Sequence, residues 1–331
     1  MKKDIIKVLV TLPVNESHKA KLESVSDLAE IRCVPSNELT EEAVSGAEVI
    51  LGNIPHALLP ACESLKLLQL GSAGADGYPE LMPEGARLTN SSGAYGLAIS
   101  EHMLGMLLAV KKKLYLYDEN QRSALWQDEG PVTSIEGAYV LSVGMGDIGG
   151  EFAKKSKALG AYTVGVRRST ANKPEYVDEL HTLDSIDALL PKADVVALSL
   201  PSGAATNGLM NEARLRLLKP GAVLINVGRG SAIVTEALVK VCSEGRIFAA
   251  LDVTDPEPLP PEHPLWRLPN VHITPHISGF FHLPQTLERI VAISAENLRR
   301  YASGEPLLNL VDPGTSYRRP ENRADENVTK Q

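Results

Sequence analysis

Apolar residues along the chain fall into short runs that alternate with stretches of helical periodicity. In the N-terminal part the apolar runs are residues 5–11, 48–51 and 66–70, and turn residues follow each of them. Short apolar strands that alternate with helices are typical of parallel βαβ units whose sheet is covered on both faces. A longer apolar helix is then predicted from about Leu97.

A second alternating series begins near residue 138. Its strand candidates are residues 139–143, 162–166, 195–200, 223–227, 248–253 and 271–274. Six strands in one unit are typical of the dinucleotide-binding form of the doubly wound sheet. A long amphipathic helix is predicted over residues 283–302. The tail from residue 312 is polar and has no apolar period, so we expect it to be poorly ordered.

The composition is that of a globular protein, with 44% apolar and 22% charged residues in a chain of 331, enough for two domains. The net charge of −8 argues against a general nucleic-acid binder, which needs excess Lys and Arg to displace counterions. No apolar run reaches membrane-spanning length. The stretch behind Lys2 and Lys3 is short, so it predicts a first strand rather than a signal peptide.

The three cysteines lie far apart and have no metal-ligand spacing. An odd number cannot pair fully within one chain, so we expect reduced thiols in a cytoplasmic protein, and no metal site. The basic run at residues 111–113 is interpreted as a solvated face rather than a phosphate site.

A glycine motif, GMGDIG at residues 144–149, joins the predicted strand at 139–143 to a helical pattern. Gly144 permits a tight turn, Gly146 lets the backbone approach a pyrophosphate, and Gly149 lets helix and strand pack closely. The helix N-terminus that follows favours an anion. We therefore expect a dinucleotide to be bound by Gly144, Gly146, Asp147, Ile148 and Gly149.

The next strand should end in the residue that recognises the adenosine ribose. An Asp or Glu there binds the 2′-hydroxyl of NAD. This strand ends instead in Arg167, Arg168 and Ser169. Two guanidinium groups and a hydroxyl suit a 2′-phosphate, so NADP is the preferred cofactor, with NAD as the alternative if the arginines only face water. Pro201, after the strand at 195–200, is assigned to the same cofactor site.

Polar residues follow three successive strands of the second series: Arg229 after 223–227, Asp252 and Glu257 at and beyond the end of 248–253, and His276 after 271–274. The carboxyl ends of strands in an open α/β sheet point into the ligand crevice, so these side chains can converge beside a nicotinamide.

Ketone reduction needs this set of residue types. The developing alkoxide requires a proton, which His can donate near neutral pH. A carboxylate such as Glu257 beside that His orients it and favours its protonated form. Arg229 can bind the carboxylate of a 2-keto acid with two hydrogen bonds. Each of the three also has a purely structural interpretation, but their placement behind one cofactor motif favours catalysis.

These segments resemble the D-isomer-specific 2-hydroxyacid dehydrogenase family from residue 1 to about residue 311. The strongest markers are VGMGDIG at 143–149, NVGRG at 226–230, LDV at 251–253, DPEP at 255–258 and TPH at 274–276. The resemblance implies that Arg229 binds substrate and polarises the ketone. It also implies that His276 is the acid/base with Glu257 as its partner, and that Asp252 holds the nicotinamide carboxamide.

The same resemblance implies two doubly wound α/β domains, with a Rossmann cofactor domain inserted in a flavodoxin-like substrate domain. The substrate domain would comprise residues 1–98 and 283–311, the NAD(P) domain 99–282, and a polar tail 312–331. Three residues after a strand, Ser72, Ala73 and Gly74, resemble the family's substrate loop, whose N–H groups can bind a carboxylate. The helix from Leu97 and the arm through Trp126 resemble a dimerisation segment, so we expect a homodimer.

The sequence therefore predicts a reductase that uses NADPH to convert a small 2-keto acid into, by resemblance, the (R)-2-hydroxy acid. One alternative is a relative that oxidises formate or phosphite. The formate branch has Gln at the position of Glu257, whereas the phosphite branch keeps all three catalytic residue types. Another is a nucleotide-sensing, corepressor-like binding protein. Phe280, Phe281 and His282 are less typical of the family, and the sequence assigns them no role.

Overall fold

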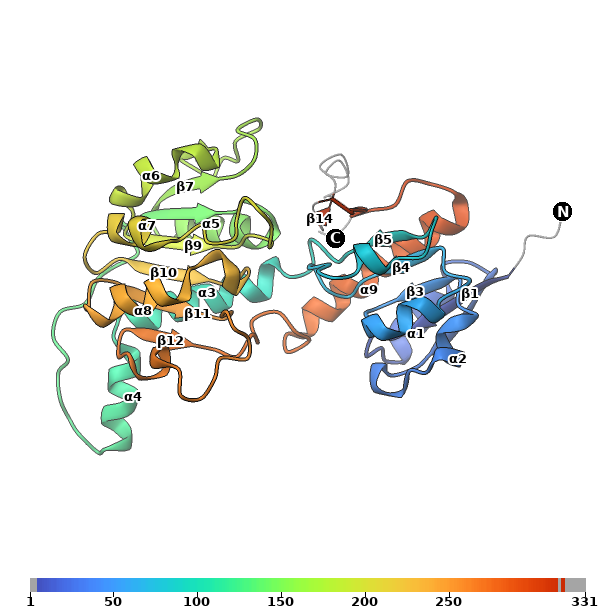
Figure 1. The fold of residues 1–331 in the computed structure, drawn as a ribbon, viewed down its shortest axis with the longest axis horizontal. Coiled ribbons are helices and arrows are strands. Elements are labelled where there is room, and N and C mark those ends of the chain that lie inside the picture. The colour runs from blue at the N-terminus through green and yellow to red at the C-terminus, as the bar shows by residue number, and fades with distance from the viewer. Residues whose placement is uncertain (1–4, 315–316, 319–331) are drawn as a thin grey trace. The chain divides into compact units, whose positions relative to one another are not determined.

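The computed structural model describes residues 5–314 and 317–318. The chain divides into two units (Figure 1): Met1–Tyr95 with Phe281–Gln331, and Gly96–Phe280. The units therefore change at residues 95–96 and 280–281, where the sequence predicts 98–99 and 282–283. Within the described residues, no helix combines the length and apolar character needed to cross a membrane.

The first unit is built on a parallel five-stranded sheet in the order β2-β1-β3-β4-β5, which is the flavodoxin-like order. Its strands are β1 (Ile6–Val10), β2 (Ala29–Cys33), β3 (Val49–Leu51), β4 (Leu67–Gln69) and β5 (Arg87–Thr89). Its helices are α1 (Glu16–Glu23), α2 (Glu41–Ser45) and α9 (Pro284–Ser303). The sequence pattern missed β2 and β5, which form the two edges. Their polar and partly exposed residues give no continuous apolar run.

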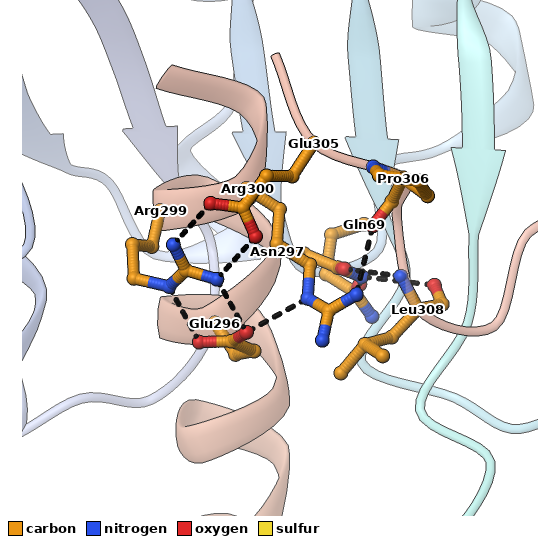
Figure 2. A network of polar contacts seen from close by, with 8 residues as sticks. All are labelled: Gln69, Glu296, Asn297, Arg299, Arg300, Glu305, Pro306 and Leu308. Carbon is orange, nitrogen blue, oxygen red and sulfur yellow. Dashed lines mark hydrogen bonds and ion pairs between the residues drawn. The ribbon is translucent and has the colours of Figure 1, made fainter. Parts of the chain in front are cut away.

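The C-terminal helix α9 returns to the sheet of the N-terminal strands, and a polar network fixes it there (Figure 2). The buried amide of Asn297 donates to Gln69 Oε1 on β4 at 2.5 Å and accepts from the backbone N–H of Leu308 at 2.7 Å. Arg299 binds the carboxylate of Glu305 with two hydrogen bonds, of 2.6 and 2.8 Å. The helix and the segment after it are therefore held to strands that lie more than two hundred residues earlier in the chain.

The predicted polar tail begins differently from expectation. Residues 317–318 form β14 (Tyr317–Arg318), which pairs antiparallel with β13 (Val311–Asp312). The expectation that the tail is poorly ordered from residue 312 is therefore wrong for Asp312 and residues 317–318, which belong to this strand pair. Residues 319–331, where the rest of the predicted tail falls, lie outside the described part of the chain.

The second unit is built on a parallel seven-stranded sheet in the order β12-β11-β10-β9-β6-β7-β8. Its strands are β6 (Tyr139–Val143), β7 (Tyr162–Val166), β8 (Glu179–His181), β9 (Val195–Leu198), β10 (Val223–Asn226), β11 (Phe248–Leu251) and β12 (Val271–Ile273). Its helices are α3 (Gly96–Lys111), α4 (Leu114–Arg122), α5 (Asp147–Ala158), α6 (Ile186–Leu189), α7 (Glu212–Leu217) and α8 (Thr235–Ser243). Counted from the β8 edge, the first six strands of this sheet lie in the Rossmann order. The first unit has the flavodoxin-like order, so both units have the predicted fold class.

The sequence predicted six strands in this unit, and β8 was missed. β8 lies at the sheet edge beyond β7, and all three of its residues are only half-buried. An edge strand needs no continuous apolar run, so its pattern does not stand out. The four central strands β9, β10, β6 and β7 carry almost entirely buried residues, and the pattern located each of them.

The basic run at residues 111–113, which begins with the last residue of α3, is not the solvated face that the sequence predicts. Lys111 is buried, which lowers its pKa, and its amine contacts Thr133 Oγ1 at 3.4 Å. The amine of Lys112 donates to the carbonyl of Thr133 at 2.9 Å, and that of Lys113 to the carbonyl of Glu129. These amines bind one side chain and two backbone carbonyls of the arm that follows α4, and they hold this arm against the end of α3.

Candidate active site

The glycine turn between β6 and α5 has the geometry of a phosphate cradle. Gly144 has a positive φ of 99°, and a Cβ there would lie 2.6 Å from the carbonyl oxygen of Ser199. A Cβ on Gly149 would lie 1.9 Å from the oxygen of Gly144. Gly146 is the N-cap of α5 and provides no side-chain cap, so the first-turn amides of Asp147 and Ile148 keep their capacity to bind an anion.

The side chain of Asp147 has a second contact, because it accepts the backbone N–H of Gly96 at 2.6 Å. A Cβ on Gly96 would lie 2.3 Å from this carboxylate, so only glycine fits there. Asp147 therefore joins the start of α3 to the phosphate turn. Pro201, beyond the end of β9, accepts a hydrogen bond at its carbonyl from Thr206 Oγ1 at 2.7 Å.

The two arginines after β7 differ in their surroundings. The Arg167 guanidinium donates to the carbonyls of Ser169 at 2.6 Å, Asn172 at 3.0 Å and Ala171. It therefore shapes its own loop, a use that the sequence did not suggest. Arg168 is exposed, as is Ser169.

The loop that carries Arg229 is built by a buried asparagine at the end of β10. Asn226 Nδ2 donates to the carbonyl of Arg229 at 2.9 Å, and its Oδ1 accepts the N–H of Gly228 at 3.1 Å. A Cβ on Gly230 would lie 2.0 Å from the carbonyl oxygen of Thr254, so this loop packs directly on the one that leads to Glu257. The Arg229 side chain is half-buried, and its Nη1 donates to the carbonyl of Gly228 at 2.8 Å.

The structure brings His276 and Glu257 together. The imidazole Nδ1 lies 2.5 Å from Glu257 Oε1, and the two side chains are 47% and 40% exposed. Arg229, Glu257 and His276 follow β10, β11 and β12, which are neighbours in one parallel sheet, so all three emerge at its carboxyl edge. The ring of Phe280 lies beside the imidazole, with 6.2 Å between centroids.

Asp252 lies at the same edge but is 1% exposed. Its Oδ1 accepts from Thr274 Oγ1 at 2.5 Å and from the N–H of Ile277 at 3.0 Å. Its Oδ2 accepts from Ser278 Oγ at 2.5 Å and from the N–H of Ser278 at 3.1 Å. Burial opposes ionisation of Asp252, but these four hydrogen bonds outweigh it and lower its pKa.

In the first unit, the predicted substrate loop is held by asparagines. Asn53 Oδ1 accepts the N–H of Ser72 at 3.1 Å, and Asn90 Nδ2 donates to the carbonyl of Ala73 at 2.7 Å. The N–H of Ser72 is therefore occupied, contrary to the expectation that the loop exposes it. Among residues 5–314, the N–H groups of Ala73 and Gly74 meet no protein acceptor.

Comparison with known proteins identifies the family of this chain. The profile of the D-isomer specific 2-hydroxyacid dehydrogenase NAD-binding domain matches residues 104–278. The glyoxylate reductase of Thermofilum pendens is 33% identical over 267 residues, which cover 78% of each chain. The chain belongs to the D-isomer specific 2-hydroxyacid dehydrogenases.

Solved structures of this dehydrogenase family have the same fold. A family protein from Aeromonas salmonicida aligns with a TM-score of 0.82 and 30% identity, over 93% of this chain and 99% of its own. An NADPH-dependent glyoxylate/hydroxypyruvate reductase from Sinorhizobium meliloti, in complex with NADP and sulfate, aligns with a TM-score of 0.79 and 25% identity, over 94% and 100%.

The NAD-binding domain of a 2-hydroxyacid dehydrogenase binds a pyrophosphate, and the turn at Gly144–Gly149 suits one because no side chain caps the N-terminus of α5. Side chains at Gly144 and Gly149 would clash with Ser199 and with the carbonyl oxygen of Gly144, so the close packing of this turn requires glycine. Among the described residues, no group of three or more His, Cys, Asp or Glu side chains is arranged to hold a metal. The cysteines are free, and burial raises the pKa of Cys62 to about 11 and of Cys242 to about 12, so both are neutral thiols.

Several residues that shape these dehydrogenase sites were missed at the sequence level: Asn53, Asn90, His102, Asn226, Thr274 and Ser278. Asn226, Thr274 and Ser278 stand inside or beside the quoted motifs, so their position was a usable signal. Asn53 binds Ser72, which lies 19 residues later, and His102 binds Thr274, which lies 172 residues later. Nothing in the local sequence pattern indicates these partners.

Proposed function

We propose that this dehydrogenase reduces small 2-keto acids to 2-hydroxy acids with NADPH. The observation that carries the proposal is the His276–Glu257 pair, 2.5 Å apart, at the same sheet edge as Arg229 and in the unit that contains the phosphate cradle. The glyoxylate reductase relative and the NADPH-dependent reductase structure support this substrate class and cofactor.

A reduced nicotinamide cofactor, held by the turn at Gly144–Gly149, would supply the hydride for the carbonyl carbon of the substrate. Arg229 binds the substrate carboxylate and polarises the ketone oxygen. His276 Nδ1 is engaged by Glu257, so Nε2 is the nitrogen that donates a proton to the forming alkoxide. The neighbouring carboxylate stabilises the imidazolium before transfer and fixes the orientation of the ring. Oxidation of the hydroxy acid uses the same groups in reverse.

The proposed NADP preference depends on Arg168 and Ser169. Arg167 already binds three carbonyls of its own loop, so we assign the 2′-phosphate to the exposed Arg168. Because a charge-assisted hydrogen bond contributes about 1.5–3 kcal/mol, Arg168→Asp should lower kcat/KM for NADPH about 10- to 100-fold. NADH should be used as well as before, and Arg168→Lys should retain part of the preference. An unmodified enzyme that prefers NADH would contradict the assignment.

The loop of the first unit is proposed to bind the substrate carboxylate through the N–H groups of Ala73 and Gly74. Ser72 has a supporting place in this proposal, because its N–H binds Asn53 and its hydroxyl donates to the carbonyl of Gly74 at 2.7 Å. An Asn53→Ala substitution, which releases the loop, should raise KM for the keto acid more than it lowers kcat.

A homodimer is proposed through α4 and the arm that follows it. This segment exposes Leu114, Leu125 and Trp126, the last of them fully. Exposed apolar side chains in one segment are typical of an interface. Sedimentation should give a dimer at micromolar concentration, and Trp126→Glu should shift it toward monomer. A monomeric wild-type protein contradicts this proposal.

A turnover assay tests the function as a whole. NADPH oxidation is measured with glyoxylate, hydroxypyruvate and 2-keto acids with larger side chains, and chiral chromatography identifies the product. Formate and phosphite are tested with NADP⁺ in parallel. The proposal expects keto-acid reduction that yields the (R)-hydroxy acid. Turnover of phosphite or formate alone would replace it with the oxidase alternative, and nucleotide binding without any turnover would favour the sensor alternative.

A further inference from the structure

The backbone of His276 adopts a conformation that needs external support. Its φ is 51°, in the left-handed region that side-chain-bearing residues rarely adopt. Its N–H donates to the carbonyls of Asp252 at 2.8 Å and Thr274 at 3.0 Å. Such a conformation is strained and persists only where the surroundings determine it. The source of that support decides whether the imidazole reaches Glu257.

Both sides of His276 are tied to one buried carboxylate. Thr274 lies two residues before it, and Ile277 and Ser278 follow directly after it. All three donate to Asp252, and they use about four lone-pair positions, which is the full capacity of a carboxylate. The resemblance implies that Asp252 holds the nicotinamide carboxamide. In the structure its carboxylate accepts four hydrogen bonds from the loop of His276.

A helix from the start of the second unit completes this cluster. His102 on α3 lies with Nε2 3.0 Å from Thr274 Oγ1 and 3.7 Å from Asp252 Oδ1. The single hydroxyl proton of Thr274 goes to Asp252, so its oxygen accepts from His102, and Nε2 of His102 carries a proton. A chain of hydrogen bonds therefore runs from α3 through Thr274 to Asp252.

We propose that Thr274, held between His102 and Asp252, is a positioning residue that fixes His276 in its left-handed conformation for proton transfer. Thr274 acts through the backbone of His276 and not on the substrate. The proposal rests on the proposed function, since it assumes that His276 is the proton donor. It differs from a role in cofactor binding, because it affects the proton-transfer step and leaves nucleotide affinity unchanged.

The test compares Thr274→Val, which is isosteric but lacks the hydroxyl, with Thr274→Ser, which keeps it. The valine variant should lower kcat for keto-acid reduction about 10- to 100-fold, the effect of a small misplacement of a catalytic group. KM for the keto acid and the Kd for NADPH, measured by fluorescence, should change less than about twofold. The serine variant should recover most of the rate.

Two outcomes would overturn the proposal: an unchanged kcat in the valine variant, or a kcat loss matched by weaker NADPH binding. If Thr274→Val does not fold, His102→Leu removes the outer hydrogen bond of the chain. It should give the same pattern of lost kcat with NADPH binding kept, and wild-type kinetics in it would also overturn the proposal. The turnover assay of the wild type separates failure of the proposed function from failure of the positioning role of Thr274. Only failure of the proposed function leaves the wild-type enzyme unable to reduce any keto acid.

Discussion

Two clusters of polar side chains lie at the ends of β11 and β12, and they differ in almost every physical property. His276 and Glu257 form a pair that is nearly half exposed. Asp252 and Thr274, with Ser278 and His102, form a network around a carboxylate that is 1% exposed. Both clusters contain a carboxylate with a histidine nearby, and in the proposed mechanism the exposed pair meets the substrate.

The difference separates chemistry from geometry. A proton donor must meet the substrate, so its side chain cannot be fully enclosed. A buried carboxylate must have every lone pair satisfied, and satisfied groups are rigid. In the proposed mechanism the buried cluster holds the backbone while the exposed pair exchanges the proton. The following predictions test this division of roles.

The largest effect is expected at the exposed pair. Removing the proton donor with His276→Ala should lower kcat for keto-acid reduction about 10²- to 10⁴-fold, the usual contribution of a positioned acid. The Kd for NADPH should not change, because the phosphate cradle lies on β6 and α5. Steady-state kinetics with nucleotide titration measure both, and an alanine variant with a near-normal kcat would remove His276 from the mechanism.

The next effect is expected at Arg229, which belongs to neither cluster. Arg229→Ala removes both the carboxylate clamp and the polarisation of the ketone, so it should raise KM and lower kcat, together about 10- to 100-fold or more in kcat/KM. Arg229→Lys should recover only part, since a point charge cannot form two parallel hydrogen bonds. Wild-type kinetics in the alanine variant would exclude Arg229 from substrate binding.

A smaller effect is expected when the exposed pair loses its charge but keeps its shape. Glu257→Gln replaces the charge-assisted hydrogen bond to the imidazole with a neutral one, which is about half as strong, so kcat for keto-acid reduction should fall about 3- to 10-fold. The Kd for NADPH should not change. Steady-state kinetics of the two proteins measure this, and an unchanged kcat in the Gln variant would show that Glu257 is not the functional partner of His276.

The buried cluster should affect stability in the acid range. Hydrogen bonds lower the pKa of Asp252, so the stability from its ionised form is fully present above the ordinary Asp pKa of about 3.9. That stability is lost as pH falls through the lowered pKa. The Tm of the wild type should therefore fall more steeply below pH 4 than that of Asp252→Asn. Parallel Tm–pH curves would mean that Asp252 does not contribute in this way.

The features that could be predicted from the sequence are local ones. The GxGxxG turn, the buried central strands and the polar residues after β10, β11 and β12 all lie within a few residues of the pattern that indicates them. The missed strands β2, β5 and β8 lie at sheet edges, and their partly exposed residues give no regular apolar pattern in the sequence.

The site details that were missed depend on the three-dimensional path of the chain. Arg167 turns onto carbonyls of its own loop, and the N–H of Ser72 is taken by Asn53. His102 meets Thr274 across 172 residues. Residue type indicates that such groups can form hydrogen bonds, but only folding decides which partner each one receives.

A double-mutant cycle between the two clusters tests the division of roles most directly. Single-turnover rates of NADPH oxidation are measured for the wild type, Thr274→Val, His276→Ala and the double variant. If Thr274 acts through His276, its substitution should lower the rate in the wild type and have almost no further effect once the imidazole is absent. Equal losses in both backgrounds would show that the buried cluster acts on the reaction independently of His276, which would contradict the account.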